Sequence, residues 1–111
     1  MLLDTHVHTI YSIDGYATPR DIARLADKKN IIIAVTDHDA IRGSLRANSV
    51  SKRIITGTEV SSGGGHIVAL GIREKVKPHM SAAETVDRIH DLGGVAIAAH
   101  PFRAREGLGR K

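Results

Sequence analysis

The sequence predicts an α/β protein whose strands are mainly parallel and whose helices lie outside the sheet. Segments in which apolar and polar residues alternate are followed, several times along the chain, by segments with the period of an amphipathic helix. Such strand–helix repeats favour parallel strands joined by right-handed crossovers. With 111 residues, of which 41% are apolar and 25% charged, the chain is long enough for one domain with one core.

The first half of the chain predicts two strands separated by a helix. Over residues 2–8 the side chains that would face one side of a strand differ from those that would face the other, the pattern of a half-buried strand. The helix is expected to begin with Thr18 as its N-cap, to have Asp21 complete a capping box, and to end at Asn30. Residues 31–35 form a continuous apolar run, which is typical of a strand buried on both faces.

The second half predicts two helices and three further strands. The helices are expected over residues 41–50 and from a capping box of Ser81 and Glu84 to a stop at Gly93. The strands are expected over residues 53–58, 66–71 and 95–99, with a turn at residues 63–65. The strand over residues 95–99, like the one over residues 31–35, is short and apolar on both faces, as a barrel or a doubly wound sheet requires.

Composition excludes several classes of protein. The chain has no cysteine, which excludes disulfides and thiolate metal sites and fits a reducing cytoplasm, so any metal must be bound by nitrogen and oxygen atoms. We expect no membrane association, because no apolar run could span a bilayer and the N-terminus does not resemble a signal peptide. The formal net charge of +4 favours anionic partners, but a nucleic-acid binder has little further support, since two Tyr and one Phe provide few platforms for bases.

Metal-binding residue types gather where the expected strands end. In parallel α/β folds these ends share one rim, where ligands and catalytic groups collect. The residues at expected strand ends are His6, His8, Asp37, His38, Glu59 and His100, and Asp14 lies in the loop after the first strand. His66 is different because it begins its strand. It reaches the same rim only if that strand runs antiparallel or the preceding turn is very tight.

This set of residues suits a centre of hard divalent cations. His6 and His8 lie two residues apart on one strand, so both imidazoles can reach one ion. Glu59 is the candidate carboxylate that bridges two ions. Nitrogen and oxygen ligands favour Zn, Mn or Fe, and two close ions can lower the pKa of a bound water to about 7 and clamp a phosphate during in-line displacement. Each motif alone has a structural explanation, but their joint occurrence indicates a metal site.

Four other features have weaker functional interpretations. His79 reads as a plain loop residue and His90 as a helix surface residue. The glycines at 63–65 lack the lysine of a phosphate loop and read as a tight turn. Arg103 is placed to make a bidentate contact with a substrate phosphate, or it is a solvated arginine of the tail.

The order of the motifs resembles the PHP (polymerase and histidinol phosphatase) family up to about Arg103. The matching segments are Asp4-Thr5-His6-Val7-His8-Thr9, Ser12-Ile13-Asp14-Gly15, Thr36-Asp37-His38-Asp39, Gly57-Thr58-Glu59-Val60-Ser61, His66-Ile67-Val68-Ala69-Leu70-Gly71 and Ala98-Ala99-His100-Pro101. The resemblance implies the N-terminal part of a distorted (β/α)7 barrel with up to three metal ions. It also implies which residues bind each ion. His6 and His8 would bind the first ion, and Glu59 would bridge the first and second ions. His66 and His100 would complete the second ion's ligands, and Asp14 and His38 would bind the third.

The resemblance further implies a phosphoesterase of the stand-alone branch, and the lack of cysteine favours a cytoplasmic one. Residues 1–103 would form the PHP domain and residues 104–111 a basic tail. The expected reaction is hydrolysis of a phosphorylated metabolite or nucleotide through a metal-activated hydroxide, with Arg103 on the phosphate and Asp39 or a metal-bound water as general acid. The alternative is a non-catalytic metal-binding PHP module that needs further chain or a partner for activity.

The sequence departs from the family pattern at its C-terminal end. PHP barrels have a later Asp-x-His motif, and no histidine or aspartate follows His100 here. We therefore expect either a fragment or a naturally shortened product, and a poorer catalyst than full-length relatives. An incomplete barrel has an unpaired strand edge, which predicts self-association.

Overall fold

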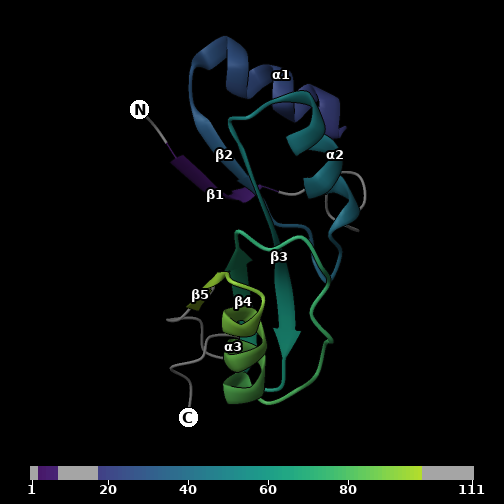
Figure 1. The fold of residues 1–111 in the computed structure, drawn as a ribbon, viewed down its shortest axis with the longest axis vertical. Helices are drawn as coiled ribbons and strands as arrows, with labels where there is room; N and C mark the ends of the chain where they lie inside the picture. The colour runs from purple at the N-terminus through teal and green to yellow at the C-terminus, as the bar shows by residue number, and fades with distance from the viewer. Residues whose placement is uncertain (1–2, 8–17, 99–111) are drawn as a thin grey trace.

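The computed structural model describes residues 3–7 and 18–98 of the chain (Figure 1). In chain order the elements are β1 (Leu3–Val7), α1 (Pro19–Lys29), β2 (Ile32–Val35), α2 (Arg42–Val50), β3 (Ile54–Ser62), β4 (Gly65–Leu70), α3 (Ala82–Asp91) and β5 (Val95–Ala98). The strands form one sheet in the order β1-β2-β3-β4-β5. The α/β class predicted from the sequence is confirmed.

Strand direction explains how the sheet is mainly parallel and yet mixed. β1, β2 and β3 pair in parallel, whereas β4 is antiparallel to both β3 and β5. Of the five strands, therefore, only β4 runs in the opposite direction. A two-residue turn at Gly63 and Gly64 separates β3 from β4, so β4 starts at the end of the sheet where β3 finishes. An antiparallel strand was one of the two arrangements expected to bring His66 to the rim, and it is the one observed.

The helix boundaries follow from local capping. The Thr18 side chain accepts a hydrogen bond from the backbone N–H of Asp21 at 3.1 Å, which is one of the two bonds of the capping box expected there. α1 ends at Asn30, whose φ of 55° is left-handed. The capping box of Ser81 and Glu84 at the start of α3 is complete. These caps were predicted from the sequence, because they depend only on residues within one turn of each other.

The helices cover one face of the sheet and form two separate apolar clusters. α1 and α2 pack against β2 and the start of β3, and α3 packs against β4 and β5 (Figure 1). The first cluster comprises Ile22, Ala23, Ala26, Ile33, Val35, Ala47 and Ile54, and the second comprises Val60, Ile67, Ala69, Ile72, Val76 and Ile89. β3 contributes to both clusters and therefore joins the two halves of the protein.

The opposite face of the sheet carries Glu59, and we call it the site face. Residues directly opposite each other in a ladder share a face. Glu59 lies opposite Val68, and Val68 lies opposite Ile97. Val60, Ile67 and Ala69, which pack with α3, alternate with these residues and point the other way. The described helices thus pack against the face opposite Glu59.

Two expectations about strands were wrong. The third strand was expected over residues 53–58, but β3 continues to Ser62 because its second half pairs with β4, so Glu59 lies inside a strand. The last strand was expected to be buried on both faces. In fact Val95 is 59% and Ile97 43% exposed, since both lie on the site face, away from α3. The expectation for residues 31–35 holds, as Ile33, Ala34 and Val35 are buried.

Within the described residues, none of the helices has the length and apolar character needed to cross a membrane.

Candidate metal centre

His38 lies in a loop that is tied to β3 by backbone hydrogen bonds. The N–H of Glu59 donates to the carbonyl of Asp37, and the N–H of Asp39 donates to the carbonyl of Glu59, both at 2.9 Å. The Thr58 hydroxyl also donates to the carbonyl of Asp37. These bonds continue the parallel ladder of β2 and β3 past the end of β2 and pair His38 directly with Glu59.

The β3–β4 hairpin brings His66 to the other side of the same carboxylate. His66 lies opposite Ser61 in the ladder, and Ser61 is two residues from Glu59, so His66 and Glu59 are diagonal neighbours on the site face. His66 Nδ1 lies 3.1 Å from Glu59 Oε2. The reversed direction of β4 is the reason that a histidine near the start of a strand reaches this rim.

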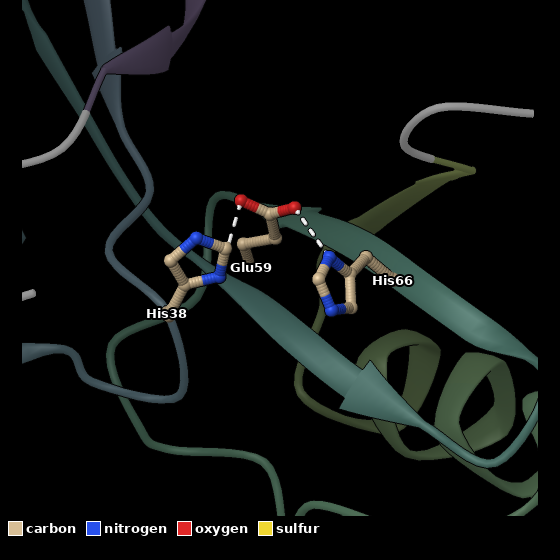
Figure 2. Close-up of side chains that lie close together, drawn as sticks. All are labelled: His38, Glu59 and His66. Atoms are coloured by element: carbon tan, nitrogen blue, oxygen red, sulfur yellow. Dashed lines mark hydrogen bonds and ion pairs between the residues drawn. The ribbon is translucent and has the colours of Figure 1, made fainter. Parts of the chain in front are cut away.

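Glu59 therefore lies between two imidazoles, one from each side, as Figure 2 shows. His38 Nδ1 is 3.5 Å from Glu59 Oε1, and the two rings meet edge-on with centroids 5.4 Å apart. One ligand atom from each residue lies within 4.8 Å of the others. Each carboxylate oxygen faces a different histidine, which is the arrangement a carboxylate needs to bridge two cations.

Burial makes this group suited to a cation. Glu59 is fully buried, while the side chains of His38 and His66 are 25% and 30% exposed. A buried carboxylate costs several kcal/mol in lost hydration unless positive charge or hydrogen bonds compensate for it. The Nδ1 atoms of the two imidazoles face this carboxylate, and a cation bound among the three residues would offset its charge.

The structure describes part of the predicted ligand set. It brings His38, Glu59 and His66 together. The side chains of His6, His8, Asp14, His100 and Arg103 lie outside the described part of the chain, although the backbone of His6 lies in β1, beside β2.

The weaker candidates lie apart from this group. His79 and His90 are exposed, and neither belongs to the group of His38, Glu59 and His66 among the described residues. Both oxygens of the Asp39 carboxylate accept hydrogen bonds from Ser61.

Sequence reasoning missed Ser61. It was noted only as the last residue of the motif around Glu59, without a role. Its position two residues after Glu59 places it on the site face, and recognition that the strand continues past Glu59 would have shown this. Its partner Asp39 lies 22 residues away, and spacing gives no indication of that contact.

Comparisons with known proteins agree with the geometry. The PHP domain family matches residues 4–98. An uncharacterised protein of Methanocaldococcus jannaschii is 34% identical over 92% of this chain, and a 5'-3' exoribonuclease of Haemophilus influenzae is 34% identical over 71% of it. A solved amidohydrolase from Chromobacterium violaceum, with bound sulfate and no metal, covers 82% of the chain with 28% identity and a TM-score of 0.56.

The chain spans different shares of these three proteins. It covers 68% of the Methanocaldococcus protein, 31% of the exoribonuclease and 33% of the amidohydrolase chain.

Proposed function

This chain belongs to the PHP family of metal-dependent hydrolases, and from this premise we propose that it acts as a phosphoesterase on a small phosphorylated metabolite or nucleotide. The observation that carries the proposal is the buried Glu59 carboxylate, with one oxygen facing His38 and the other facing His66. Two imidazole nitrogens beside one buried carboxylate are a ligand set that a divalent cation can use, and both histidines remain partly exposed.

The distances in this group support a metal site. Zn and similar ions bind histidine nitrogen and carboxylate oxygen at about 2.1 Å. Two ligands at angles of about 90–110° around one ion are then about 3.0–3.4 Å apart. The two Nδ1–oxygen distances of 3.1 and 3.5 Å fall close to this range, so a cation fits with little rearrangement. We propose that Glu59 binds cations through both oxygens, with His66 beside one oxygen and His38 beside the other. This departs from the assignment that the resemblance implies, in which His38 binds an ion that Glu59 does not.

The remaining predicted ligands complete this proposal. His6, His8, Asp14 and His100 match the family's motif positions, and we propose that they bind the same cluster of Zn, Mn or Fe ions. When bound, these ions supply Lewis-acid charge and lower the pKa of a coordinated water, which is how metal centres assist phosphate ester hydrolysis. Glu59 holds negative charge at a fixed point, and the exposed edges of the imidazoles leave the group open to solvent on the substrate side.

The substrate class follows from charge and from the relatives. A formal net charge of +4 favours an anionic substrate. The similarity to an exoribonuclease makes a nucleotide phosphoester a sensible first substrate to assay. We also propose that Arg103 contacts the substrate phosphate, since a guanidinium can bind it through two parallel hydrogen bonds.

The test is hydrolysis of a generic phosphate monoester and of a short oligonucleotide by the metal-stripped chain, with Mn or Zn added back. We expect turnover that requires metal and disappears with a chelator. Metal binding without turnover would instead support a non-catalytic metal-binding module, and the absence of both would refute the proposal. In an active preparation, Arg103→Ala should raise KM several-fold and leave metal content unchanged. Unchanged kinetics would indicate that Arg103 is a solvated residue that does not contact the substrate.

A further inference from the structure

The Asp39 carboxylate takes the place of a backbone carbonyl at the end of a strand ladder. Glu59 donates its N–H to Asp37, and Asp39 donates its N–H to Glu59, as parallel strands do. The next bond in this pattern would run from the Ser61 N–H to the carbonyl of Asp39. The chain turns away at Asp39, where φ is 48°, and the Ser61 N–H donates instead to Asp39 Oδ1 at 2.8 Å.

A second bond fixes the carboxylate on its other side. The Ser61 hydroxyl donates to Asp39 Oδ2 at 2.7 Å, so one serine binds both oxygens. His38 lies between Asp37 and Asp39, each of which is bonded to β3. The chain on both sides of His38 is therefore held to β3.

We propose that Asp39 is a positioning residue that acts with Ser61 to hold the His38 imidazole against Glu59 and His66. This role differs from that of a general acid, because it requires only that the side chain bind Ser61. The inference deepens the proposed function and rests on it for its metal measurement alone. Ser61 lies two residues beyond Glu59 on the site face, so the same link fixes the loop relative to the strand that carries Glu59.

Two substitutions at Asp39 separate hydrogen bonding from acidity. In Asp39→Asn the amide oxygen can accept from the Ser61 N–H, the amide nitrogen can donate to the Ser61 hydroxyl, and asparagine tolerates a left-handed φ. Asp39→Gly also suits this backbone conformation but removes both bonds. Glu84→Ala is the matched control, because it removes a carboxylate that accepts a bond from the Ser81 N–H at the start of α3.

The first measurement is made on the metal-free chain by NMR. The edge-on contact of the two rings should give cross-relaxation between His38 and His66 ring protons, and the Ser61 amide should exchange slowly with solvent. Both signals should be present in Asp39→Asn and Glu84→Ala and lost in Asp39→Gly. If both signals persist in Asp39→Gly, the proposal is overturned.

The second measurement is the Kd for Zn by calorimetry. Residues that orient metal ligands typically contribute 10–100-fold to affinity, so Asp39→Gly should weaken binding by at least about tenfold and Asp39→Asn by less than about threefold. Equal affinity in wild type and Asp39→Gly would overturn the inference. The inference would also be overturned if Asp39→Asn and Asp39→Gly both lost turnover while keeping their affinity for Zn and the contact between the two rings. That result would identify Asp39 as a general acid. If the wild type binds no ion, the proposed function fails, and the NMR measurement still decides the positioning role.

Discussion

Replacing Glu59 by glutamine tests the metal centre most directly. The substitution keeps the shape of a fully buried side chain and one carbonyl oxygen, but it removes the negative charge between His38 and His66. Metal affinity should fall because a neutral amide is a weak ligand for a divalent cation. The metal-free protein should be no less stable than the wild type, since burying an amide costs less than burying a carboxylate.

The size of the effect can be estimated. Two unit charges 4 Å apart interact by about 4 kcal/mol at an effective dielectric constant of about 20. After allowance for the amide dipole and water, a loss of about 2.7 kcal/mol, or 100-fold in Kd, is a conservative estimate. An ion at 100 times the wild-type Kd stabilises the wild type by about 2.7 kcal/mol. The same concentration equals the Kd of Glu59→Gln and stabilises this variant by about 0.4 kcal/mol.

The assay is thermal unfolding with and without Zn at that concentration. For a domain of this size, about 1 kcal/mol shifts Tm by roughly 4 °C, so the ion should raise Tm by about 11 °C in the wild type and about 2 °C in Glu59→Gln. Glu84→Gln is the control, because Glu84 takes part in the capping box of α3 and glutamine can replace glutamate there. If the two Glu→Gln variants show the same ion-induced shift as the wild type, the reasoning about Glu59 is wrong.

Three further outcomes are expected. His66→Asn should lose most of the Zn-induced rise in Tm, whereas His90→Asn, on the exposed face of α3, should keep it. Gly57→Ala should lower the free energy of unfolding by about 1–3 kcal/mol in urea, because a Cβ there would lie less than 3.0 Å from the carbonyl oxygen of Ala69. Self-association remains a prediction. If the apolar part of the site face drives it, Ile97→Thr should lower the apparent mass measured by sedimentation at high protein concentration. A wild-type mass that does not change with protein concentration would contradict self-association.

Features that depend on neighbouring residues were predicted well from the sequence. The cap of α1 at Thr18 and the capping box of α3 at Ser81 and Glu84 are each contained within four residues. The burial of β2 follows from an apolar run that needs no knowledge of its partners. His38 and Glu59 were placed on one rim because parallel strands that end together must share an edge.

Features that depend on which strand pairs with which were predicted less well. The direction of β4 was left open, although two strands separated by Gly63 and Gly64 are a recognisable hairpin signal. The length of β3 was underestimated because its second half owes its strand conformation to β4. The exposure of Val95 and Ile97 depends on what covers the site face, and an apolar strand sequence does not contain that information.

The position of the proposed metal centre would give metal binding a mechanical consequence. His38 belongs to the half of the protein built on β2 and α2, His66 belongs to the half built on β4 and α3, and Glu59 lies on the strand that both halves share. Metal bound on both sides of Glu59 would therefore add a link between the two apolar clusters, which are already joined by β3 and by the packing of Ile41 against the second cluster. Because these ligands come from both halves, metal binding would stabilise the folded state of the two halves together. The hydrogen bonds between Asp39 and Ser61 would then hold a proposed metal ligand, His38, to the strand that joins the two halves.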